Sequence, residues 1–237
     1  MGVYVYSVTD KQHPLRLDDL RGVGASPGPL RAVTAGSLCA VVSDAPEDLR
    51  PKRRDVGAHQ EVQERLMADG TVLPLRFGLV AASDDEVRAA LEERADEYTD
   101  RLRELEGCTE YHLKVAQDED SLLRLILAES PPARQLNDEI RGGTADPAAA
   151  VRLGELVAQE VQARQEALAA GVVEALRPFA RDLDSSQPTG SDFLSVSFLV
   201  ADDQEEAFLT TELSVAHQLG EGLDFRLNGP LPPYSFV

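Results

Sequence analysis

The sequence predicts an α+β protein of two domains, the second of them ferredoxin-like. Three observations lead to this prediction. Short runs with the two-residue period of a β-strand alternate along the chain with longer runs that have the period of a helix. The 237 residues, 43% of them hydrophobic, are enough to fill two modest cores. The final third has the strand–helix–strand order of a layered α+β domain.

The first domain is expected to span residues 1–107 and to contain a compact β-α-β element. Its predicted strands lie near residues 3–8, 38–43 and 71–73, and its helices at 55–69 and 84–106. Pro74 cannot donate a ladder hydrogen bond, so the third strand should lie at an edge or a bulge. Gly107 suits a left-handed helix cap, and Glu97 and Arg101 have the spacing of an exposed ion pair.

The second domain is expected to span residues 108–237, with a distinct tail at 229–237. Its predicted strands are at 111–115, 193–200 and 223–227, and its helices at about 118–130, 146–179 and 208–219. The segment 134–147, which contains Gly142-Gly143, is interpreted as an exposed connection or a flexible loop. This order favours ferredoxin-like layers, although one of the usual four strands is not evident.

The predicted helix at 146–179 is unusually long. About thirty residues at about 1.5 Å each give a length near 45 Å, more than a small core requires. Two interpretations stay open: a helix packed along its own sheet, or an arm that protrudes toward a partner.

Charge excludes some classes of partner. The 42 acidic residues outnumber the 23 basic ones, for a net charge of −19, so DNA or an anionic membrane would repel the chain. No window approaches eighteen apolar residues, and no secretory signal is recognised at the N-terminus. Cys39 and Cys108 are expected to be reduced thiols. These features favour a cytoplasmic protein that binds neither nucleic acid nor membrane.

No catalytic, metal-binding or cofactor-binding motif is recognised. The four histidines have no zinc-ligand spacing. The spacing of the Gly22–Gly28 run fails the dinucleotide pattern, and Pro27 and Pro29 stand where a helix N-terminus should present its N–H groups. The acidic clusters lack the glycine and final glutamate of a calcium loop. The sequence therefore predicts a binding or assembly protein, without cofactor, rather than an enzyme.

Arg76 and Phe77 are candidate site residues within the run Leu73-Pro74-Leu75-Arg76-Phe77-Gly78. An arginine among apolar neighbours requires a partner if it is buried. It would then form a structural ion pair that holds the strand to a helix; alternatively, it faces a binding partner.

Tyr234 and Phe236 are the candidate residues of the tail. Three prolines in the tail remove backbone donors and favour extended geometry. Each aromatic ring would bury roughly 150–250 Å² if docked. The tail is expected to dock on its own C-terminal domain, with a partner-binding peptide as the alternative.

Four separated features carry a resemblance to a known family. They are Val3-Tyr4-Val5-Tyr6, His59 on the first helix, the run Val72–Gly78, and the terminal Gly-Pro-Leu-Pro-Pro-Tyr-Ser-Phe-Val. Together they resemble the gas vesicle protein GvpL/GvpF family over nearly the whole chain. The family pattern often has Glu, Thr and Trp where Gln60, Leu79 and Leu231 stand here.

The resemblance implies an N-terminal α+β domain of unusual topology and a C-terminal modified ferredoxin-like domain. It implies a gas vesicle location, and it implies binding to the small hydrophobic shell protein, and to other gas vesicle accessory proteins, during vesicle assembly. A minor structural component that nucleates or lines the shell is the alternative. The resemblance brings no catalytic residues.

Overall fold

The structure, a computed structural model, describes residues 2–143, 146–220 and 222–237. It confirms a mixed helix-and-sheet protein with a long helix and two sheets. The chain divides into two compact units. Unit 1 contains Met1–Tyr111, Leu199–Asp202 and Gly229–Val237, and unit 2 contains His112–Phe198 and Asp203–Asn228. The end of the chain therefore belongs with its beginning.

Unit 1 is built on an antiparallel sheet. Its strands are β1 (Val3–Asp10), β2 (Arg31–Ala35), β3 (Leu38–Asp44), β4 (Val72–Pro74) and β5 (Val80–Ala81). The order is β2-β3-β1-β4, and β5 also pairs with β1. As predicted from Pro74, β4 lies at the end of this order. The strands β2 and β5 were not predicted, because runs of five and two residues are too short to show a clear strand period.

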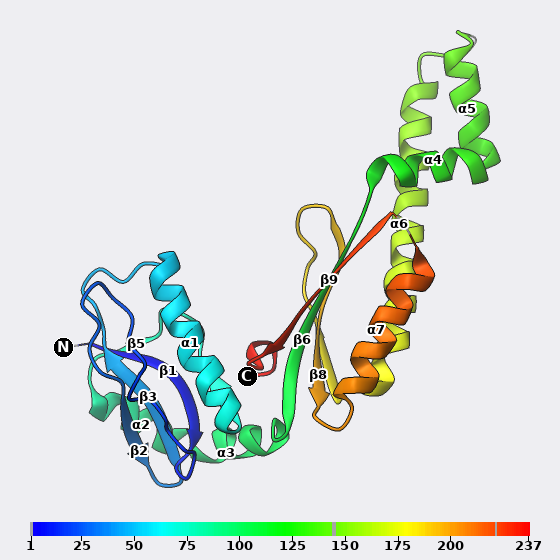
Figure 1. The fold of residues 1–237 in the computed structure, drawn as a ribbon. Helices are drawn as coiled ribbons and strands as arrows, with labels where there is room; N and C mark the ends of the chain where they lie inside the picture. Colours follow the sequence, from blue (N-terminus) through cyan, green and yellow to red (C-terminus); the bar gives the residue numbers. More distant parts are fainter. Residues whose placement is uncertain (1, 144–145, 221) are drawn as a thin grey trace. The chain divides into compact units, whose positions relative to one another are not determined.

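Helices cover both faces of this sheet (Figure 1). They are α1 (Arg53–Asp69), α2 (Asp84–Glu93) and α3 (Ala95–Glu104). Alternate side chains of β1 point to opposite faces of the sheet. Val3 and Val5 pack with α2 and α3 on one face, and Tyr4 and Tyr6 pack with α1 on the other. The β1–β3 register shifts between Val5 and Ser7, and both faces of β1 remain buried.

Two helices, α2 and α3, replace the single helix predicted at 84–106. Arg94 leaves helical geometry between them, with φ −112° and ψ 24°. The apolar period continues through the break, at Leu91 and then Leu102, so periodicity alone does not reveal it. The side chain of Ser83 caps α2 by accepting a hydrogen bond from the Glu86 N–H at 3.2 Å.

Unit 2 holds most of a four-stranded sheet in the order β7-β8-β6-β9. The strands are β6 (Cys108–Gln117), β7 (Asp182–Ser185), β8 (Asp192–Ala201) and β9 (Leu223–Leu231). Numbered along the chain from β6, the order across the sheet is 4-1-3-2 from β9 to β7, the arrangement of a ferredoxin-like domain. The strand missing from the prediction is β7, a polar edge strand.

The helices of unit 2 are α4 (Glu119–Glu129), α5 (Pro131–Arg141), α6 (Ala149–Leu176) and α7 (Glu205–Leu219). The prediction of an exposed connection at 134–147 is wrong over most of its length, because α5 occupies residues up to Arg141. Pro131 and Pro132 lie in the first turn of α5. Backbone N–H groups of a first turn have no partner within the helix, so the N–H that proline lacks is not missed there. Residues 144 and 145 fall outside the described ranges.

The long helix α6 is packed along its length within unit 2. Its first half lies beside α5 and its second half beside α7 (Figure 1). A small core of Leu122, Ile126 and Ala133 joins α4 and α5 to the side chains of α6. These neighbours are helices, and only Ala149, Val172 and Leu176 of α6 are buried, so the two interpretations of the long helix both stay open. Within the described ranges, no helix is both long and apolar enough to span a membrane.

Candidate binding site

The C-terminal tail packs into the core of unit 1. Phe236 is only 3% exposed and belongs to the same core as Leu73 and Leu102. The expected docking on the C-terminal domain, residues 108–237, is thus only part of the contact: Phe236 fills a space beside α3, whereas Ser235 binds Glu110 on β6. Gly229 is required where the tail begins, because a Cβ atom there would lie 2.3 Å from Cδ1 of Tyr111.

Polar contacts fix the tail on both sides of Phe236. The Arg101 guanidinium donates a hydrogen bond to the main-chain carbonyl of Phe236. The buried carboxylate of Glu110 accepts two bonds from Ser235, from its backbone N–H at 2.9 Å and from its hydroxyl at 2.7 Å. Hydrogen bonds to charged groups are the stronger ones, so these contacts hold the tail in a single position.

An aromatic cluster lies between α1 and the sheet, next to the tail. His59 stacks on Tyr6 with ring centroids 5.7 Å apart and makes edge contacts with Tyr4 and Phe77. Tyr234 also stacks on His59, with ring centroids 6.5 Å apart. His59 thus links strand, helix and tail, and burial lowers its pKa below the usual histidine value.

The hydroxyl groups of Tyr4 and Tyr6 each hold a neighbouring loop by a hydrogen bond from its backbone. The hydroxyl of Tyr4 accepts a bond from the Gly78 N–H at 3.2 Å and contacts Nδ1 of His59 at 2.9 Å. Because that hydroxyl accepts from Gly78, its own proton is available to His59. The Tyr6 hydroxyl accepts from the Val23 N–H at 2.9 Å. Burial raises the pKa of both tyrosines, so they remain neutral donors.

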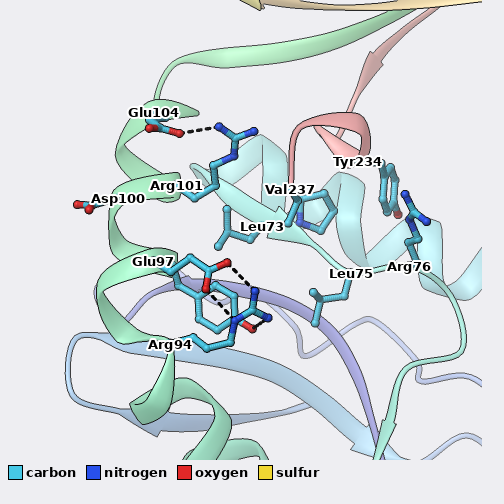
Figure 2. A pocket seen from close by; sticks show the side chains of 12 residues that line it. Leu73, Leu75, Arg76, Arg94, Glu97, Asp100, Arg101, Glu104, Tyr234 and Val237 are labelled. Atoms are coloured by element: carbon cyan, nitrogen blue, oxygen red, sulfur yellow. Dashed lines mark hydrogen bonds and ion pairs between the residues drawn. The ribbon is translucent and has the colours of Figure 1, made fainter. Parts of the chain in front are cut away.

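A pocket of about 560 Å³ opens between α3, β4 and the tail (Figure 2). Its apolar lining includes Leu75 and Val237 (Figure 2), with the fully buried Leu73 behind them, and Tyr98 of α3 also lines it. The rings of Tyr98 and Tyr234 come from distant parts of the sequence and both face this space. Burial raises the Tyr234 pKa to about 12, so its hydroxyl stays protonated at neutral pH.

Charged side chains on α3 line the pocket, and most of them are already paired. Arg94 donates to Glu97 at 2.9 Å and lies 4.9 Å from the centre of the Tyr98 ring. Arg101 pairs with Glu104 at 2.5 Å. The predicted pair between Glu97 and Arg101 is therefore replaced by two pairs three residues apart, which extend along α3 (Figure 2).

Arg76 is the exception on the opposite wall. Its side chain is exposed, lies beside Tyr234 in Figure 2, and makes no hydrogen bond or ion pair with any residue in the described ranges. The structural ion pair considered for Arg76 is thus not formed within this part of the chain. A partner-binding role for Arg76 stays a prediction.

The four candidate residues come together around the tail in unit 1. Phe77 is half-buried in the aromatic cluster, and Phe236 is in the core. Arg76 and Tyr234 line the pocket. The geometry therefore separates two residues with packing roles from two that are accessible in the pocket.

Sequence reasoning missed Glu110 and Tyr98. Glu110 lies on β6, 125 positions before Ser235, so only the fold brings them together. A weak signal exists for Glu110: it stands among alternating β6 residues, next to the buried Tyr111. A carboxylate buried in a strand requires donors, which the tail provides.

The described residues show no group of three or more His, Cys, Asp or Glu side chains that could hold a metal ion. The pocket instead combines apolar surface with paired charges, an arrangement typical of a protein-binding surface.

Comparison with known proteins agrees with this arrangement over the whole chain. A family model described as "Gas vesicle synthesis protein GvpL/GvpF" matches residues 2–237. The chain belongs to the GvpL/GvpF family. A GvpL/GvpF relative, gas vesicle protein F of a Streptomyces species, is 42% identical over 240 residues and covers 100% of both chains. Gas vesicle protein L1 of Halobacterium salinarum is 28% identical, over 100% of this chain and 90% of its own.

Solved structures of GvpL/GvpF proteins share the fold. The crystal structure of GvpF from Microcystis aeruginosa matches with a TM-score of 0.81 at 25% identity, over 99% of this chain and 98% of that chain. GvpF from Anabaena matches with a TM-score of 0.86 at 23% identity, over 99% and 97% of the two chains. The protein is thus a gas vesicle protein of a family whose members are structural or accessory proteins rather than known enzymes.

Proposed function

We propose that this GvpL/GvpF protein binds the small hydrophobic shell protein at the gas vesicle and assists vesicle assembly, with other gas vesicle accessory proteins as further partners. The observation that carries the proposal is the pocket beside the tail, in a chain that belongs throughout to a gas vesicle family. An accessible apolar surface rimmed by charges suits a partner that is itself apolar.

The charge of the chain supports the same proposal. A shell subunit that is poorly soluble on its own tends to associate through exposed apolar surface. A partner with a net charge of −19 would keep the complex in solution, because complexes of like charge repel one another. The acidic chain would therefore hold a shell subunit until it joins the growing shell.

Co-expression tests the proposal. The shell protein should move from the insoluble to the soluble fraction when this chain is present, and the two should copurify. The matched control is an unrelated acidic protein of similar size, which should leave the shell protein insoluble. If the shell protein stays insoluble and no complex forms at micromolar concentrations, the proposal fails.

Purified vesicles distinguish an assembly factor from a minor structural component. A transient assembly factor is expected to leave the vesicles during stringent washing. Retention in a constant ratio to the shell protein would instead identify a structural part that nucleates or lines the shell. Quantitative mass spectrometry of washed and unwashed vesicles measures this ratio.

A further inference from the structure

The pocket beside the tail continues into a second apolar depression in unit 1. Leu75 and Tyr98 line both. The second depression has a volume of about 210 Å³ and lies between α2 and the segment that includes Leu79 and Val80. We call the combined surface the α3 groove: Leu73, Leu75, Arg76, Tyr98, Tyr234 and Val237 at the tail end, and Leu79, Val80, Val87 and Ala90 at the α2 end.

Exposed apolar side chains of unit 1 gather along this groove. Leu79 is 48% exposed and Val80 is 45% exposed, although both are large aliphatic residues. Of the large apolar side chains exposed in the described part of unit 1, only Val56 on α1 lies outside the groove; Val237 is the third member inside it. Exposed apolar surface that is clustered rather than scattered indicates an interaction site.

Charge distinguishes the possible occupants of the groove. The acidic side chains in the tail-end pocket are each paired on α3: Glu97 with Arg94, Glu104 with Arg101, and Asp100 with Arg103. Arg76 has no such partner, either among these carboxylates or at the terminal carboxylate of Val237, within the residues that the structure describes. A guanidinium next to apolar surface recognises a carboxylate by paired, directional hydrogen bonds.

From this arrangement, we propose that the α3 groove binds a short apolar segment of a partner protein that carries a carboxylate, with the apolar side chains against Leu75, Leu79 and Val80 and the carboxylate on Arg76. The inference rests on the proposed function, in which that partner is the shell protein. Along helix α3, with 10 residues at about 1.5 Å each, the groove is about 15 Å long. Two to three turns of an amphipathic helix fit this length.

Matched substitutions in the full-length chain test the inference. Arg76→Glu and Leu79→Asp change exposed groove residues, so both variants should fold like the wild type. Arg53→Glu and Val56→Asp make the same chemical changes at exposed positions of α1 in the same unit, outside the groove. Circular dichroism confirms folding before any binding is measured.

The probe is the shell protein fused to a soluble carrier, and the readout is the dissociation constant by calorimetry. Each groove variant should weaken binding at least about tenfold, as expected for an interfacial charge reversal or a buried charge, whereas each α1 control should stay within about twofold of wild type. If the groove variants bind as tightly as the controls, the α3 groove is not the binding surface, although the proposed function stands.

A second probe separates failure of the inference from failure of the proposed function. Two synthetic amphipathic peptides share one apolar sequence and differ only by a central Glu or Gln. The Glu peptide should bind the wild-type chain more tightly, and Arg76→Glu should reverse the preference, because the substituted carboxylate repels that of the peptide. If the carrier-fused shell protein does not bind but this pattern holds, the proposed function fails and the groove chemistry stands. If neither peptide binds, the groove inference is overturned.

A second copy of this chain is the competing occupant. Sedimentation of the wild type and of Leu79→Asp should give the same mass. An oligomer in the wild type that Leu79→Asp converts to a monomer would overturn the proposal and make the groove a self-association surface.

Discussion

Ser235 donates two hydrogen bonds to one carboxylate, that of Glu110: from its backbone N–H at 2.9 Å and from its hydroxyl at 2.7 Å. Glu110 is only 4% exposed, so its carboxylate requires hydrogen-bond donors from the protein in place of water. This contact joins β6, the first strand after α3, to the short helical turn Tyr234–Phe236 of the tail. It makes the tail a structural part of unit 1, not a loose extension.

Glu110→Ala should destabilise unit 1 by about 2–3 kcal/mol, because two hydrogen bonds to a charged group are lost. Glu110→Gln should cost less, since the amide oxygen can accept from the N–H of Ser235 while the hydroxyl turns to accept from the amide. Thermal unfolding by circular dichroism measures both. Glu92→Ala, at an exposed position of α2, is the control and should stay within about 0.5 kcal/mol. An equal loss for Glu92→Ala would contradict this account of Glu110.

Phe236→Ala should lower the unfolding free energy by about 3–5 kcal/mol, the usual effect of removing a buried aromatic side chain from a core. Tyr234→Ala should have a smaller effect, because Tyr234 is only half-buried. Chemical denaturation of the two variants gives the comparison. A chain truncated after Pro233 loses both rings and should melt at least as early as Phe236→Ala. Equal stability of the truncated and complete chains would show that the tail does not anchor here.

His59 should make stability depend on pH. Burial lowers its pKa in the folded chain, so below about pH 6.5 the unfolded chain binds a proton that the folded chain does not. Its stabilising contribution is therefore complete above that pH and decreases as pH falls, by at most about 1.4 kcal/mol per pH unit. Chemical denaturation at several values between about pH 7.5 and about pH 5, above the range in which most carboxyl groups titrate, measures this slope.

The control for this pH dependence is His59→Gln, which cannot titrate. Its absolute stability should be lower, because contacts with Tyr4 and Tyr6 are lost. The informative quantity is the slope with pH, which should be smaller than in the wild type. Identical slopes would assign the pH dependence to other histidines.

The two thiols should react at different rates. Cys39 is buried and burial raises its pKa, so both access and thiolate formation are suppressed. Cys108 is half-buried at the start of β6 and should react first. A thiol reagent should therefore modify one cysteine per folded chain rapidly and the second only after denaturant is added. Cys108→Ser should remove the rapid phase; rapid reaction in that variant would contradict the burial of Cys39.

The sequence predicts the anchors better than the places where they dock. Tyr234 and Phe236 stand out because aromatic rings follow a proline-rich run. Their docking site does not, because Glu110 and Leu73 meet the tail only after the chain has passed through unit 2. Contacts over such separations leave no local period in the sequence.

Local sequence patterns also fail to predict structure where the outcome depends on the elements packed against them. Pro131-Pro132 predicts the end of α4 correctly. The same two residues also begin α5, because proline is accepted in the first turn of a helix. The polar strand β7 forms because β8 offers it a partner, not because its own residues favour a strand. Arg76 was recognised as unusual, but only the structure shows that it is exposed in a groove rather than buried in an ion pair.

Hydrogen–deuterium exchange on the full-length chain, with and without the carrier-fused shell protein, locates the surface that binds the shell protein. At saturation we expect slower exchange in the segment 75–80, along α3 and in the tail, while α1 near Val56 and unit 2 stay unchanged. Slower exchange confined to α1 or to unit 2, or no change at all at saturating shell protein, would contradict this expectation.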